Sequence, residues 1–197
     1  MEQTSGISLG IGAGAPVYKA GASVNGTLLK LGVNNVYTTS FSNVLTPAGV
    51  QYEAELMFGN GVFYNAPSKD NVVYAGAPTV ASAVPVFAGI VVRSPAIQGA
   101  YPANGEGAYQ YNKVNIVKDG YMIYRSGINL SAAAVTFSSA EIAVGNYIYV
   151  RNTDGAVAFG ASATSAGFTT VGRIVQLNPD DESWTVKLDA SSAVYTA

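Results

Sequence analysis

The side chains that could carry out chemistry in this chain are almost all carboxylates. Its 197 residues include no histidine and no cysteine. The chain therefore lacks an imidazole base for neutral pH, a thiolate nucleophile and the two ligands that zinc sites use most. What remains is the paired-carboxylate arrangement that hydrolyses glycosides. The candidates are Glu53 with Glu55, which share one face if the segment is extended, and Glu106 with Asp119.

None of these carboxylates has surroundings typical of a catalytic centre. Glu53 and Glu55 lie among ordinary strand residues, and Asp119 belongs to an expected turn. Residues 180–182 are Asp-Asp-Glu, but they lack the alternating oxygen ligands and the glycine of a calcium-binding loop. We interpret them as a solvated hairpin tip. The sequence thus predicts a protein that is not an enzyme and that uses no cofactor and no metal.

The composition favours association between copies. The chain has 10 Lys or Arg and 12 Asp or Glu, so 11% of its residues are charged, against about 25% in an ordinary globular protein. The apolar share of 49% is too high for a disordered chain. The net charge of −2, without a basic run, argues against a nucleic-acid partner. Because so few charges keep copies apart, we expect a homo-oligomer, either a dimer or a trimer.

Two segments bear on a membrane or a secretory signal. Residues 1–14 carry Glu2 as their only charge, which differs from the basic start of a secretory signal. Residues 72–92 are apolar and uncharged but contain Pro78 and Pro85. Prolines inside such a stretch favour extended chain over a membrane helix. We therefore expect no membrane partner.

Short runs of strand-forming residues separated by turn signals begin after the first 16 residues. The Asn-Gly pair at 25–26 predicts a type I′ hairpin turn, since both residues tolerate positive φ. Residues 59–61, Gly-Asn-Gly, indicate a turn or a bulge. The Asp-Gly pair at 119–120 predicts a hairpin between the runs 113–117 and 121–125.

The last third of the chain predicts further strands. A turn at 152–155 joins the runs 147–151 and 156–159, and residues 178–182 join two final runs at 170–177 and 183–188. In the last of these, a buried and a wet face are indicated by alternation of Trp184, Val186 and Leu188 with Thr185, Lys187 and Asp189.

These patterns predict an all-β fold, because no stretch has the periodicity of a long amphipathic helix and the runs are short and regularly spaced. We expect a jelly-roll-like sandwich or barrel of short antiparallel strands. Residues 1–16, rich in glycine, form a flexible N-terminal arm in this prediction. Residues 17–130 form the main β domain and residues 131–197 a C-terminal β hairpin lobe, unless the two are one domain.

Tyrosine is abundant, with 13 residues in the chain. Those of the second half gather around the expected hairpins and are Tyr109, Tyr111, Tyr121, Tyr124, Tyr147 and Tyr149. Such rings suit a subunit interface, half-buried packing along strands, or a platform that binds glycans. The sequence leaves these three alternatives open.

Several segments together resemble one known family. They are Phe58-Gly59-x-Gly61-Val62, Ala-Gly-Ile-Val-Val-Arg at 88–93, and 109–124 with its core Val-x-Ile-Val-x-x-Gly-x-Met-Ile. Downstream follow Gly-Asn-Tyr-Ile-Tyr-Val at 145–150, Asp154-Gly155, and Gly-Arg-Ile-Val at 172–175. Over about residues 50–190 this pattern resembles the structural cement (capsid decoration) proteins of tailed bacteriophages.

The resemblance implies a β-rich protein made in the host cytoplasm and located in the virion, on the outer surface of the capsid. It would bind the major capsid protein and bridge its subunits, without catalysis or cofactor. The alternative is a tail- or fibre-associated β module that binds host-surface glycans. From the arm and from exposed tyrosines we expect the capsid or subunit interface to include Ile7, Leu9, Ile11, Tyr101, Tyr109 and Tyr111.

Overall fold

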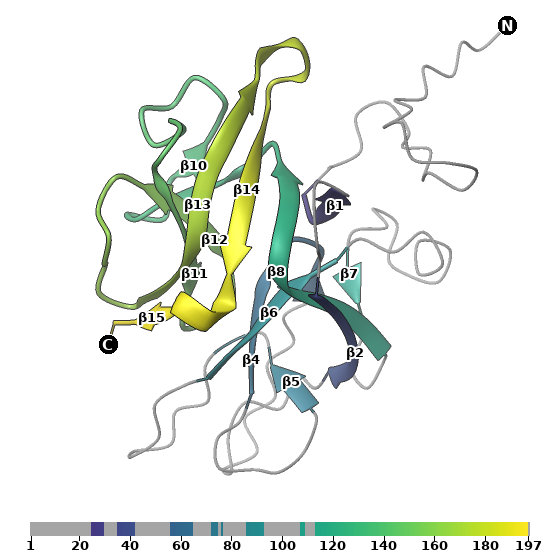
Figure 1. Cartoon of the computed structure of the whole chain (residues 1–197). Coiled ribbons are helices and arrows are strands. Elements are labelled where there is room, and N and C mark those ends of the chain that lie inside the picture. Colours follow the sequence, from purple (N-terminus) through teal and green to yellow (C-terminus); the bar gives the residue numbers. More distant parts are fainter. Residues whose placement is uncertain are drawn as a thin grey trace, which may run out of the picture.

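The computed structural model describes residues 25–29, 35–41, 56–64, 72–74, 76, 86–92, 107–108 and 113–196, and every structural statement below refers to these residues. They form strands and two short 3-10 helices, with no α-helix among them, which confirms the all-β prediction (Figure 1). The strands are β1 (Thr27–Leu29), β2 (Asn35–Phe41), β3 (Leu56–Met57), β4 (Gly61–Tyr64), β5 (Val72–Tyr74), β6 (Val86–Val91), β7 (Gly107–Ala108), β8 (Lys113–Tyr124), β9 (Gly127–Asn129), β10 (Ala134–Val135), β11 (Tyr147–Arg151), β12 (Val157–Gly160), β13 (Phe168–Asn178), β14 (Ser183–Asp189) and β15 (Val194–Tyr195). The 3-10 helices are η1 (Pro179–Asp181) and η2 (Ala190–Ser192).

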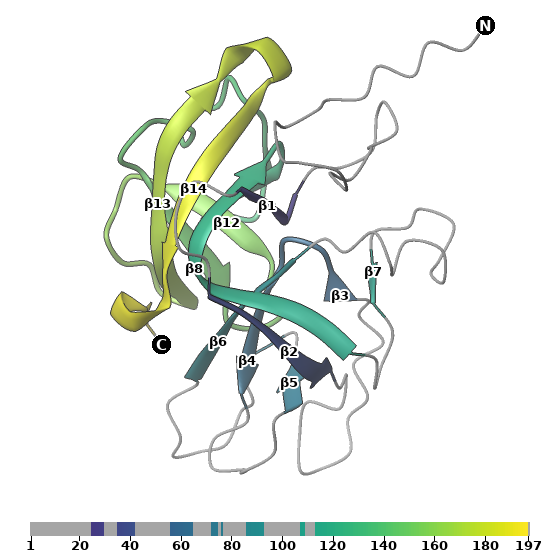
Figure 2. The same cartoon turned by 45° about the vertical axis from the view of Figure 1, so that its right-hand side comes forward.

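Strand β8 is the longest element and corrects one sequence-based prediction. The Asp-Gly pair at 119–120 does not reverse the chain, because it lies inside β8, which is 12 residues long. Gly120 has φ 148°, a conformation open essentially to glycine alone. The glycine therefore bends the strand instead of closing a hairpin, and the bend is visible in Figure 2. Asp119 pairs with Asn35 on one side and with Asp189 on the other, so long-range partners replace the expected hairpin partner.

The first half of β8 closes a ring of five strands. It pairs with β2 along one edge and with β6 along the other. Strands β5 and β4 complete the circuit, since β2 pairs with β5, β5 with β4 and β4 with β6. The barrel alternative of the sequence analysis thus describes this half of the molecule. The β2–β5 pairing is parallel, which the sequence pattern does not indicate.

The second half of β8 continues the same 13-stranded sheet into a second group of strands, called the second sheet below. It pairs with β14, and the order then runs β13, β11, β12, β9 and β10, with β15 beside β13. The predicted runs at 147–151, 156–159, 170–177 and 183–188 are confirmed here within a residue or two at their ends. All pairings in this sheet are antiparallel except β9 with β12.

One hydrophobic core joins the ring to the second sheet. Phe63 and Phe87 from the ring belong to the same buried cluster as Tyr124, Phe159 and Trp184. The rings of Phe159 and Trp184 meet edge to face with centroids 5.2 Å apart, a geometry that aromatic pairs favour. Both groups of strands share β8 and this core. The division into domains at residue 130 stays a prediction.

Glycines set how closely the two groups of strands approach. A Cβ at Gly61 would lie 2.3 Å from Cγ1 of Val150, so only glycine fits β4 against β11. The Gly61 N–H donates to the carbonyl of Gly155 at 2.8 Å, which ties the ring to the β11–β12 turn. Gly61 is visible in the sequence, but Val150 and Gly155, which it contacts, lie about 90 residues further along the chain. Local sequence pattern does not reveal contacts over such a separation.

The remaining turn predictions have mixed outcomes. Residues 58–60 form the turn expected between β3 and β4. At 25–26 a turn is present and Gly26 has φ 78°, the positive φ that the predicted turn requires there; the type I′ assignment stays a prediction. Extended chain is confirmed at β5 and β6, the described parts of the apolar stretch 72–92. No helix of the described residues is long and apolar enough to cross a membrane.

Candidate docking surface

The expected interface residues cannot be compared with the fold. Ile7, Leu9, Ile11, Tyr101, Tyr109 and Tyr111 lie outside the described residues, as do Glu53, Glu55 and Glu106. Their role in an interface, and the carboxylate pairing, stay predictions.

Among the described tyrosines, two belong to the core. Tyr124 and Tyr149 are 0% exposed, so ordinary packing describes them. The Tyr124 hydroxyl donates to the carbonyl of Gly59 at 2.8 Å, and burial raises its pKa. Burial and, to a lesser degree, Tyr147 raise the pKa of Tyr149 to about 12. The Tyr149 hydroxyl donates to the carbonyl of Ser162.

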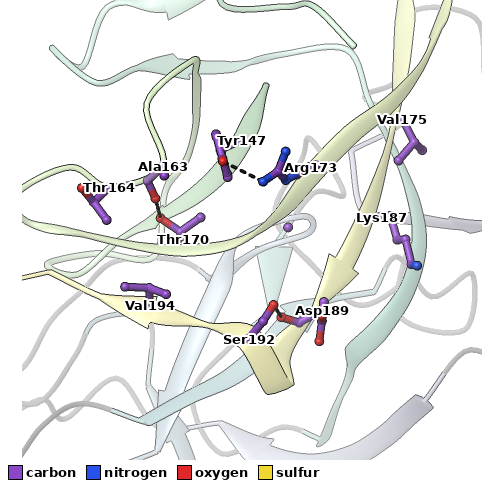
Figure 3. A pocket seen from close by; sticks show the side chains of 11 residues that line it. Tyr147, Ala163, Thr164, Thr170, Arg173, Val175, Lys187, Asp189, Ser192 and Val194 are labelled. Carbon is purple, nitrogen blue, oxygen red and sulfur yellow. Dashed lines mark hydrogen bonds between the residues drawn. The ribbon is translucent and has the colours of Figure 1, made fainter. Parts of the chain in front are cut away.

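A hollow lies on the outer face of the second sheet, where β11, β13 and β14 run side by side (Figure 3). Its volume is about 460 Å³, within the usual range for ligand pockets. The loop at 163–164 and the segment 192–194 form its rims. Val175 and Val194, which line it, are 38% and 47% exposed, although large aliphatic side chains are usually buried.

Arg173 is fixed on the floor of this hollow by Tyr147. Its guanidinium lies over the Tyr147 ring, 4.2 Å from the centroid, and one Nη donates to the phenol oxygen at 2.7 Å (Figure 3). The two residues face each other because β11 and β13 pair them in register. Stacking on tyrosine leaves the other guanidinium donors available to a partner.

A second cation stands beside Arg173. Lys187 of β14 is its direct cross-strand partner, and both side chains are exposed and line the hollow. Neither forms an ion pair within the described part of the chain, whereas Arg125 pairs with Asp181 and Arg151 with Asp154. Like charges opposite each other on a sheet destabilise it. The hollow therefore concentrates positive charge that the fold leaves unbalanced.

One carboxylate also lines the hollow. Asp189 accepts a hydrogen bond from Ser191 Oγ at 2.6 Å, and Ser192 Oγ donates to its backbone carbonyl. Bonds from Ser191 and then Ser192 hold the pKa of this carboxyl below its usual value. Two cations and one carboxylate leave the lining with one excess positive charge, although the whole chain has a net charge of −2.

The hairpin that carries both cations ends in an acidic tip. Helix η1 and the left-handed Glu182 (φ 51°) make the turn between β13 and β14, as predicted for a hairpin tip. Asp181 is engaged, since it accepts from Ser183 Oγ at 2.6 Å and pairs with Arg125. Asp180 and Glu182 are exposed and have no ion-pair partner in the described structure. Figure 1 shows this tip projecting beyond the neighbouring strands.

Asp119, the remaining carboxylate that the sequence offered for catalysis, makes a hydrogen bond within the fold. Asp119 Oδ1 accepts from the backbone N–H of Ala190 at 3.2 Å. The described residues contain no group of three or more carboxylates, histidines or cysteines that could hold a metal ion. The chemistry offered by this surface is thus recognition, through an aromatic-backed guanidinium, an ammonium and apolar side chains.

Sequence pattern alone does not identify Arg173 as a surface residue of interest. The alternation in 183–188 placed Lys187 on the wet face, and the structure confirms its exposure. That Arg173 stands opposite depends on the register between β13 and β14, which contains a bulge between Ile174 and Gln176. A register with a bulge is not fixed by alternation alone.

Known proteins resemble the chain in family and in fold. A family model described as "Structural cement protein (E217 gp24/Pam3 gp6)" matches residues 21–190. A chain of the solved structure "The capsid of Myoviridae Phage XM1" has a similar fold, with a TM-score of 0.50 and 17% sequence identity over 91% of this chain and 98% of that chain. No curated protein matches the chain in sequence.

Proposed function

The chain belongs to the phage structural cement protein family, and on this premise we propose that it binds the outside of the capsid and bridges neighbouring major capsid protein subunits. The observation that carries this proposal is the family match over residues 21–190. Family membership points to a structural role in the virion and away from catalysis. The fold shared with a chain of a phage capsid structure agrees with this role.

The physical character of the fold suits a clamp. Bridging requires a body that transmits force without unfolding locally, and here the shared strand β8 and a buried cluster with residues from both groups of strands join the ring to the second sheet. The charge content of 11% lowers the desolvation cost when broad surfaces meet. Repeated docking on a symmetric shell would sum many modest contacts.

We propose the interface residues on two grounds. Ile7, Leu9 and Ile11 are apolar side chains in a glycine-rich segment, which suits ordering against a neighbour. Tyr101, Tyr109 and Tyr111 are aromatic residues of the kind enriched at interfaces.

The glycan-binding alternative has less support. It rested on an array of surface tyrosines, and Tyr124 and Tyr149 are buried in the core. Tyr147 is covered on one face by Arg173, so its ring is not a free platform for a sugar. No other observation in the described structure favours this function.

A binding experiment with phage heads tests the proposal. Purified chain is mixed with expanded capsids that lack it, and the pellet is assayed after sedimentation. The proposal predicts saturable binding and a higher temperature for DNA release from decorated heads. A chain that stays in the supernatant at every concentration would refute the capsid role.

Matched variants test whether the apolar residues of the N-terminal arm form the capsid interface. Replacing Ile7, Leu9 and Ile11 together by serine is expected to weaken binding, because the apolar contacts of the arm are lost. Replacing Gln3, Thr4 and Ser8 together by alanine changes the same segment without removing apolar groups, and binding is expected to persist. Equal binding by both variants would assign the interface to other residues.

A further inference from the structure

We propose that the hollow over Arg173 and Lys187 receives the acidic hairpin tip, Asp180 and Glu182, of a second copy of this chain. The exchange is reciprocal, so that each copy gives one tip and accepts one. This inference concerns contacts between copies and does not depend on capsid binding. It names the surface and the charges through which the chain associates.

The two neighbouring cations on the exposed face favour an acidic partner. Arg173 and Lys187 are placed directly opposite each other on the exposed face by the β13–β14 register. This arrangement destabilises an isolated sheet, and no carboxylate of the described structure forms an ion pair with either cation. An incoming carboxylate between them would turn a repulsive pair into two attractive ones.

The β13–β14 hairpin carries charges of both signs, at opposite ends. Asp180 and Glu182 are the exposed, unpaired carboxylates at the end of the hairpin whose base carries the cations. The tip begins at the pair Asn178–Ser183, and the cations form the pair Arg173–Lys187. These two pairs are five residues apart along β13. At about 3.4 Å per residue this is about 17 Å. The tip of a chain therefore cannot neutralise its own base, but the tip of another chain can.

The lining of the hollow has the residue types of an interface centre. Tyr147 holds the Arg173 guanidinium by stacking and by a hydrogen bond, which reduces the entropy lost on binding. Tyrosine and arginine are enriched at the centres of interfaces. Exposed Val175 and Val194 offer apolar contact around the charges (Figure 3). A turn of a few residues, such as the tip with Pro179, suits a hollow of about 460 Å³.

Reciprocity follows from the location of the two features. Both lie on the same projecting hairpin, so two hairpins placed antiparallel bring each tip to the other's base. Closed two-fold dimers are the commonest symmetric assemblies.

Charge reversal tests the proposal with the full-length chain. One variant carries Arg173→Glu and Lys187→Glu, and the other carries Asp180→Lys and Glu182→Lys. Wild type is expected to sediment as a dimer that dissociates as salt rises. Each variant alone is expected to have a dissociation constant raised by about tenfold or more. A control with Glu141→Lys and Thr153→Lys changes charge elsewhere and is expected to dimerise normally.

Mixing the two variants guards against a folding defect. One then has an acidic tip and an acidic base, the other a basic tip and a basic base, so an equimolar mixture is expected to form a one-to-one heterodimer. A wild type that stays monomeric, a dimer unaffected by reversal, or a mixture that fails to associate would each overturn the proposal. If the base variant loses capsid binding while wild type is monomeric, a shell protein occupies the hollow and self-docking is wrong. The capsid role itself is decided separately by cosedimentation of wild type.

Discussion

The Tyr124 hydroxyl donates a buried hydrogen bond to the carbonyl of Gly59, 65 residues earlier in the chain, at 2.8 Å. Tyr124 ends β8, and Gly59 lies in the turn that leads into β4. This bond therefore links the end of the strand shared by both sheets to the turn that enters the five-stranded ring. Because Tyr124 is fully buried, the Gly59 carbonyl has no water to replace the lost donor.

Replacing Tyr124 by phenylalanine is expected to lower the free energy of unfolding by about 1–3 kcal/mol, the cost of leaving a buried carbonyl unsatisfied. Urea denaturation followed by tryptophan fluorescence measures the change, since Trp184 lies in the same core. The control is Tyr195→Phe, at a partly exposed ring, with an expected change within about 0.5 kcal/mol. Equal stability of Tyr124→Phe and wild type would show that the Gly59 bond contributes nothing.

Close approach of the two groups of strands at Gly61 gives a second prediction. Gly61→Ala would place a Cβ 2.3 Å from Cγ1 of Val150, so β4 and β11 must separate. Overpacking of this kind costs about 1–3 kcal/mol, and differential scanning calorimetry is expected to show a lower Tm. Gly160→Ala is the matched control, because the nearest atom there is Leu130 Cδ1 at 3.3 Å, at the end of a flexible side chain. If Gly61→Ala and Gly160→Ala have the same Tm, the crowding at Gly61 does not lower the stability.

The ion pair of the β11–β12 turn gives a prediction about acid. Arg151 Nε donates to Asp154 Oδ1 at 2.8 Å, and the Ala156 N–H donates to the same oxygen. Burial raises the pKa of Asp154, but the Arg151 hydrogen bond and the backbone bonds outweigh it, so the net pKa is lowered. A lowered pKa contributes stability above the unfolded value of about 3.9, and that stability is lost as the pH falls through the folded pKa.

Asp154→Asn is therefore expected to cost about 0.5–1 kcal/mol at neutral pH, since the side chains remain partly exposed. Below about pH 4 the difference from wild type is expected to shrink, because wild type then loses the same charge. Urea denaturation at a series of pH values measures both effects. Glu141→Gln, at a carboxylate without an ion-pair partner in the described structure, is the control with no expected change. A constant difference at all pH values would contradict the assigned ion pair.

Much of the fold follows from short runs of strand-forming residues that lie between turn signals. Strands β11 to β14 were predictable for this reason, and in β14 Trp184, Val186 and Leu188 are buried as expected. Thr185 is buried as well, although the alternation placed it on the wet face, and its hydroxyl accepts a hydrogen bond from Asn178 Nδ2 at 3.3 Å. The Asp119-Gly120 prediction failed because a dipeptide that permits a turn also permits a bend, and only long-range pairing decides between them. The pairing of Arg173 with Lys187 could not be predicted for the same reason, since it depends on the register between two strands and not on local sequence.

Cryo-electron microscopy of intact virions would locate this chain on the particle. We expect density for it on the outer capsid surface, repeated with the shell symmetry and touching at least two neighbouring major capsid protein subunits. Density that contacts a single subunit would contradict bridging. Density confined to the tail, or no copy in the particle, would contradict the cement role itself.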